Sequence, residues 1–137
     1  MDTRNDFSCT LFLDFDGVIC NSINECFVSS WIGHFGVDRL PNNIHLGVYR
    51  KFASYRPFIR RGGDYLILQQ CIHRDIDIKN QADFDAVETE LGAETSDSFH
   101  ARFYDAREHL LESDPEYWLG LNPLYSNIRP VLPQLSQ

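Results

Sequence analysis

The sequence contains no apolar run that approaches the roughly 18 residues needed to cross a bilayer. Positive charge is also scarce, because 12 lysines and arginines stand against 20 aspartates and glutamates and leave a net charge of −8. An acidic chain is poorly suited to non-specific binding of nucleic acid or of anionic membranes. These absences predict a globular protein with no nucleic-acid partner and no membrane partner.

Paired cysteine motifs are missing as well. Cys9, Cys20, Cys26 and Cys71 form no C-x-x-C pair, and no histidine stands at zinc-ligand spacing from two of them. We therefore expect free, buried thiols rather than a disulfide framework or a zinc site. The polar first six residues are followed by no apolar segment of the signal-peptide kind. Free thiols and a missing leader together favour a cytoplasmic location.

The most informative stretch is an apolar run that ends in two closely spaced aspartates. Residues 10–15 are expected to form a strand buried on both faces, because Leu11, Phe12 and Leu13 are bulky and apolar. Asp14 and Asp16 lie at the end of this strand, with Gly17 directly after. Residues two apart on an extended backbone point to the same side, so both carboxylates are expected to project together from the carboxyl end of that strand. Two such close negative charges favour a bound cation.

At this point the sequence resembles the haloacid dehalogenase-like (HAD-like) hydrolase superfamily, through residues 14–19, Asp-Phe-Asp-Gly-Val-Ile. The resemblance implies that Asp14 is the nucleophile that accepts a phosphoryl group, and that Asp16 is the general acid and base. It also implies a Mg²⁺ held at Asp14 and Asp16 and a phosphorylated small-molecule substrate. Carboxylates serve as covalent nucleophiles toward phosphorus, and Mg²⁺ takes one or two carboxylates plus substrate oxygens, so the chemistry agrees. The family often has a second acid where this chain has Asn21.

Two simpler interpretations of the same residues exist. Aspartate and glycine are common in turns for local reasons, so the motif can also be an ordinary turn. A calcium loop would place Glu25 at its twelfth position, but it would require glycine where Ile19 stands. The turn therefore remains an alternative, and the calcium loop does not.

The chain after the motif has a helical pattern. Residues 23 to about 35 carry an apolar stripe, with Ser22 and Glu25 as an expected capping box and Gly36 as the expected C-cap. Further helices are expected within residues 44–121. The longest of these reaches from about 96 to about 112 and has one apolar stripe, formed by Phe99, Phe103, Ala106 and Leu110.

The expected class is α/β, with the first strand and helix of a HAD-like Rossmannoid core and a mostly α-helical cap. Residues 1–40 would belong to the core, residues 41–123 to the cap, and residues 124–137 would return toward the core. The family's later strands, its lysine and its second acidic pair are not found in the sequence. We therefore expect the front portion of a hydrolase, inactive by itself, with a non-catalytic helical interaction module as the alternative. The substrate cannot be predicted, because cap residues follow no general code.

Overall fold

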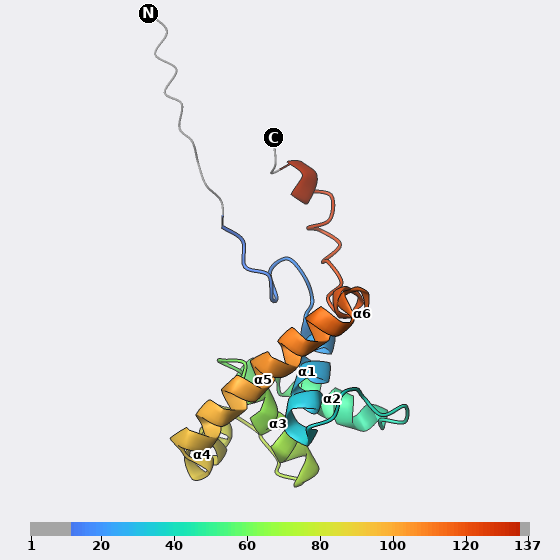
Figure 1. Ribbon diagram of the computed structural model, residues 1–137. Coiled ribbons are helices and arrows are strands. Elements are labelled where there is room, and N and C mark those ends of the chain that lie inside the picture. Colours follow the sequence, from blue (N-terminus) through green and yellow to red (C-terminus); the bar gives the residue numbers. More distant parts are fainter. Residues whose placement is uncertain (1–11, 135–137) are drawn as a thin grey trace, which may run out of the picture.

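The computed structural model describes residues 12–134, which form α-helices joined by short loops (Figure 1). No helix in this part of the chain is long and apolar enough to span a membrane. A 3₁₀ turn, η1 (Arg56–Phe58), follows the second helix, and another, η2 (Leu132–Gln134), lies near the end. In chain order the helices are α1 (Ile23–Phe35), α2 (Leu46–Ser54), α3 (Asp64–His73), α4 (Gln81–Leu91), α5 (Ala93–Ser113) and α6 (Pro115–Gly120).

The α/β class expected from the sequence is wrong. Residues 12–134 contain no β-sheet, and their strand-like contacts are isolated bridges from Cys20 to Asp16 and to Leu124. The described part of the expected strand, residues 12–15, joins no ladder, and Phe12 is 87% exposed. A strand needs neighbouring strands for its hydrogen bonds, whereas the helices that make up most of the described chain bond within themselves. Residues 10 and 11 of that expected strand lie outside the described residues.

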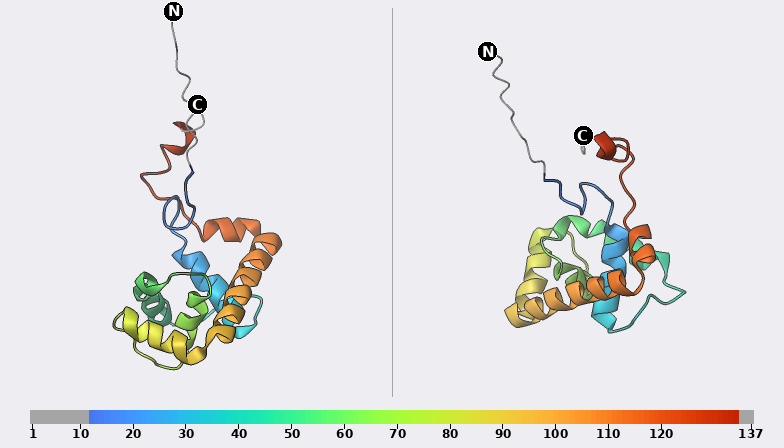
Figure 2. Two further views of the ribbon diagram at one scale, coloured as in Figure 1. Left: turned by 90° about the vertical axis from the view of Figure 1, so that its left-hand side faces the viewer. Right: turned by 45° about the horizontal axis from the view of Figure 1, so that its top comes forward.

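The core is organised around α3. Leu66, Ile67 and Leu68 are consecutive and all fully buried, so this part of the helix is covered by the protein on every side. Helices α1 and α5 both pack against α3 and against each other, while α2 covers α3 and α4 covers α5. Figure 2 shows α5 as a long rod along one side of this group, with the short α6 turning away from its end. One hydrophobic core therefore includes α1 as well as the later helices.

The apolar stripe predicted for the longest helix is confirmed. Phe99, Phe103, Ala106 and Leu110 are the large or apolar residues of α5 that are buried. Their spacing places them on one face of the helix, and that face is turned toward α1 and α3. The helix is longer than expected by a few residues at its start, where Gly92 precedes it.

Two glycines allow α5 to come close to its neighbours. A Cβ atom added to Gly33 in α1 would lie 2.9 Å from the backbone oxygen of Arg102 in α5. A Cβ atom added to Gly63, just before α3, would lie 2.8 Å from the backbone nitrogen of His100. Since these contacts involve backbone rather than a flexible side-chain end, the close approach depends on the missing side chains.

The bounds predicted for the first helix are confirmed, but its predicted capping box is wrong. Helix α1 ends where Gly36 adopts a left-handed conformation at φ 64°. At its start, Ser22 makes no side-chain capping bond, and the Asn21 carboxamide oxygen instead accepts from the Ile23 backbone N–H at 3.2 Å. Glu25 is fully buried and points into the protein, because it has a partner on α5 that local sequence does not reveal.

Candidate functional site

Residues 15–20 form a compact hydrogen-bonded turn. The backbone N–H groups of Ile19 and Cys20 both donate to the Phe15 carbonyl oxygen at 3.2 Å, and the Gly17 N–H donates to the Cys20 carbonyl oxygen at 2.9 Å. Gly17 has φ 77°, in the left-handed region that glycine adopts without a steric cost. The acidic motif is therefore fixed by its own backbone bonds rather than by a sheet.

This turn is attached to the helices at two points. The Phe15 ring stacks on Trp118 of α6, with ring centroids 5.8 Å apart and planes at 9°. The backbone on either side of Cys20 pairs with the segment after α6. There the Asn21 N–H donates to the Pro123 carbonyl oxygen at 2.9 Å, and the Tyr125 N–H donates to the Ile19 carbonyl oxygen at 3.1 Å. The segments before α1 and after α6 consequently leave the helices side by side (Figures 1 and 2).

The two aspartates of the motif have different surroundings. Asp14 is exposed, and its carboxylate accepts one hydrogen bond, at 2.8 Å, from the N–H of its neighbour Phe15. Asp16 is half-buried, and its Oδ2 atom accepts from the Arg107 guanidinium at 3.3 Å. Asp14 is thus open to solvent, whereas Asp16 is attached to the rigid helix α5.

Arg107 is itself held by a buried carboxylate. Glu25 on α1 is completely buried and accepts from Arg107 Nε at 3.0 Å and from Arg107 Nη2 at 2.5 Å. The Ser29 hydroxyl donates to the same carboxylate at 2.5 Å. The guanidinium also lies 5.0 Å from the centroid of the Phe103 ring, a cation–π contact. A chain of charges therefore runs from Glu25 through Arg107 to Asp16.

The sequence alone identified neither Arg107 nor Glu25 as a member of this site. A signal was present: Glu25 is the single charged residue in α1 before its last turn, among apolar and small residues that the helical pattern buries. A buried carboxylate requires a cation, but the sequence does not say which of 10 arginines and 2 lysines supplies it. The partner lies 82 residues later in the chain.

The pKa shifts around this chain of charges follow from burial and from the carboxylates. Burial alone would lower the pKa of the Arg107 guanidinium, but its hydrogen bonds and its attraction to Glu25, together with Asp16, raise that pKa instead. Burial and the Glu25 charge raise the pKa of the Cys26 thiol to about 11, and burial and the Asp16 charge raise that of Cys20. Neither thiol is activated as a nucleophile, because nucleophilic cysteines need a lowered pKa.

The acidic turn offers Mg²⁺ part of a coordination shell. Mg²⁺ in proteins takes one or two carboxylates together with water and substrate phosphate oxygens, and Asp14 and Asp16 are two such carboxylates. No group of three or more His, Cys, Asp or Glu side chains in residues 12–134 could hold a metal ion. Asp14 and Asp16 are therefore only two of the ligands that Mg²⁺ needs, and water and substrate oxygens would have to supply the rest.

Two consecutive arginines, Arg60 and Arg61, stand directly before Gly62 and have acidic partners. Arg60 donates to Asp85 at 2.5 Å and to Glu88 at 3.0 Å, so its charge is balanced by α4. Arg61 pairs with Glu88 at 3.3 Å and also lies 3.6 Å from the buried carboxylate of Asp64. These arginines tie α3 to α4, and they are not free to bind a phosphate.

The thiols in the described part of the chain match the expectation of free, buried cysteines. Cys20, Cys26 and Cys71 are all free and buried, while Cys9 lies outside the described residues.

Comparisons with known proteins found no match to this chain. No protein-family model matches the chain, and neither does any curated protein or solved structure.

Proposed function

We propose that the acidic turn is the phosphoryl-accepting site of a Mg²⁺-dependent, HAD-like hydrolase that acts on a phosphorylated small molecule. The observation that carries this proposal is the unequal setting of the two carboxylates. Asp14 is exposed and has no cationic partner within residues 12–134, which leaves it free to approach phosphorus. Asp16 is positioned by Arg107 at 3.3 Å, as a group that transfers protons to a defined atom needs to be.

The chemistry follows from these two roles. A carboxylate oxygen of Asp14 attacks phosphorus and forms the aspartyl-phosphate, while the bond from phosphorus to the leaving oxygen breaks and Asp16 gives that oxygen its proton. Water then attacks the phosphorus of the aspartyl-phosphate while Asp16 takes the proton from that water. The bond from phosphorus to the Asp14 oxygen breaks, which restores the Asp14 carboxylate and releases inorganic phosphate. Arg107 holds Asp16 in place during both steps.

A Mg²⁺ bound at Asp14 and Asp16 would neutralise charge on the phosphoryl group. The described residues lack the sheet on which HAD-like hydrolases carry their other catalytic groups, and after Glu116 the chain contains no lysine, aspartate or glutamate. We therefore expect the 137-residue chain alone to transfer a phosphoryl group to Asp14 without sustained turnover. The free thiols favour a cytoplasmic location for this activity.

Acetyl phosphate, a reactive phosphoryl donor, tests the proposal on the full chain. With Mg²⁺ present, intact-mass measurement should show one added phosphoryl group on the wild-type chain. Asp14→Asn should lose this adduct, because an amide is a poor nucleophile toward phosphorus. Asp16→Asn should keep the adduct and release its phosphate roughly 10²–10⁴-fold more slowly, because general base catalysis is lost.

Asp75→Asn is the matched control, since it removes an exposed carboxylate from a site that is not part of the turn. It should be labelled like the wild type. Absence of a phosphoryl adduct on a folded wild-type chain, or an equal adduct on Asp14→Asn, contradicts the proposal. Steady Mg²⁺-dependent hydrolysis of a phosphate ester that Asp14→Asn abolishes would instead show a complete enzyme.

A second function, a non-catalytic interaction module, is favoured by one specific observation. The segment before the turn exposes large apolar side chains, with Phe12 at 87% and Leu13 at 41% exposure. An unpaired apolar segment of this kind promotes association. If the module is the function, size-exclusion chromatography should show concentration-dependent oligomers that Phe12→Ser reduces, and no phosphoryl adduct should form.

A further inference from the structure

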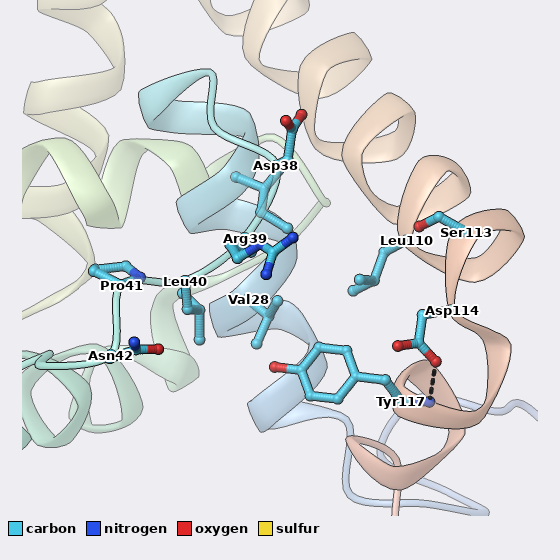
Figure 3. Close-up of a pocket in the computed structure, with 11 residues that line it drawn as sticks. Val28, Asp38, Arg39, Leu40, Pro41, Asn42, Leu110, Ser113, Asp114 and Tyr117 are labelled. Atoms are coloured by element: carbon cyan, nitrogen blue, oxygen red, sulfur yellow. Dashed lines mark hydrogen bonds between the residues drawn. The ribbon is translucent and has the colours of Figure 1, made fainter.

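A hollow of about 560 Å³ lies between the loop after α1 and the junction of α5 with α6 (Figure 3). Its floor is apolar, since Val28, Ile32 and Leu110 line it and all three are buried. Neither Asp14 nor Asp16 lines it, so this hollow is separate from the acidic turn. Its volume is in the range of pockets that hold small organic molecules.

Polar groups without partners surround this floor. The Arg39 guanidinium makes no hydrogen bond or ion pair with any residue of the described part of the chain, and the same holds for the Tyr117 hydroxyl. Figure 3 shows both groups reaching toward the space above Val28 from opposite sides. A free guanidinium over an apolar floor is a receptor for a carboxylate or a similar planar anion.

A carboxylate faces the guanidinium across the hollow. Asp114 caps α6 by accepting from the Tyr117 backbone N–H at 3.0 Å through one oxygen, Oδ1. Its other oxygen has no hydrogen bond within residues 12–134 and is available to a ligand cation. The hollow thus presents the Arg39 guanidinium and the Asp114 carboxylate on two sides of an apolar floor. Asp38 also lines the hollow, but its carboxylate points away from Val28 (Figure 3).

A second hollow, of about 360 Å³, adjoins the first and shares Val28, Leu40 and Tyr117 with it. Its remaining walls are mainly apolar and aromatic, with Phe27 and Tyr49 among them. If the charged part of a ligand occupies the first hollow, a bulky apolar group attached to it would have room in the second hollow.

We propose that these two hollows bind a free α-amino acid with a large apolar side chain. The carboxylate of the ligand pairs with Arg39, its ammonium pairs with Asp114, and its side chain lies on Val28 and Leu40. A guanidinium and a carboxylate that both face an apolar surface match a zwitterion better than a simple acid or amine. The site is independent of the phosphoryl-transfer proposal.

Calorimetric titration of the full chain with L-phenylalanine tests this proposal. Binding should be measurable, and N-acetyl-L-phenylalanine and L-phenylalaninamide, which each lack one charge, should bind about tenfold more weakly or worse. Arg39→Gln and Asp114→Asn should each lower the affinity for L-phenylalanine by a similar factor. The asparagine can still accept from the Tyr117 N–H, so the cap of α6 is retained.

Arg50→Gln is the matched control, because it removes an exposed positive charge on α2 that lines neither hollow. It should bind L-phenylalanine like the wild type. Circular dichroism of each variant verifies that the helices are intact. The proposal is overturned if the folded wild-type chain does not bind L-phenylalanine, if Arg39→Gln binds equally well, or if the acetylated or amidated ligand binds as tightly.

Discussion

Replacing Arg107 by methionine should be among the most damaging single substitutions in this protein. Glu25 is fully buried, and Arg107 is its cationic partner through bonds of 3.0 and 2.5 Å. Methionine keeps much of the aliphatic stem but leaves the carboxylate with the Ser29 hydroxyl as its nearest donor. Breaking a buried ion pair in this way costs about 3–5 kcal/mol, against a total stability of about 5–15 kcal/mol for a typical domain.

Urea unfolding, followed by circular dichroism and by tryptophan fluorescence, measures this loss directly. The double variant Glu25→Met with Arg107→Met should recover most of the stability, because removing both charges leaves no unpaired buried group. Asp16→Asn should cost less than about 1 kcal/mol, because Asp16 is 37% exposed and solvent screens its pair with Arg107. A loss below about 1 kcal/mol for Arg107→Met alone, or a double variant worse than the single one, would refute this reasoning.

Two further predictions concern helix packing and acid sensitivity. Gly33→Ala should destabilise the fold by about 1–2 kcal/mol in urea unfolding, because the new Cβ would meet the Arg102 carbonyl at 2.9 Å. Gly120→Ala should not destabilise the fold, because there is open space around Gly120. An equal loss of stability in the two variants would contradict the packing argument. Burial, followed by the nearby charges of His73 and Arg102, lowers the pKa of His34 from 6.5 to about 4. The unfolded chain therefore binds more protons between these values, so stability should fall as pH drops from about 6.5 to about 4. His34→Gln should show a shallower decline than the wild type, and a parallel decline would refute this assignment.

The helices were predictable because their signals are local. The end of α1 follows from Gly36, and the buried face of α5 follows from the spacing of Phe99, Phe103 and Leu110. Each of these features depends on residues within a few positions of one another. Periodicity and capping residues carry that information directly.

The strand and the charge network could not be predicted in the same way. An apolar run such as Phe12 and Leu13 indicates a buried strand only if other strands pair with it, and the described residues provide none. The role of Glu25 depends on Arg107, which is distant in sequence, so a capping box was the best local interpretation and was wrong. The motif made Asp14 and Asp16 the candidate site residues, but their unequal surroundings required the structure.

The pairing of residues 19–21 with residues 123–125 has a mechanical consequence. All six α-helices of the described chain lie between these two short segments, which leave the helices side by side. A force that pulls the two segments apart therefore acts first on the backbone hydrogen bonds that join them, from Asn21 to Pro123 and from Tyr125 to Ile19, before it reaches the helical core.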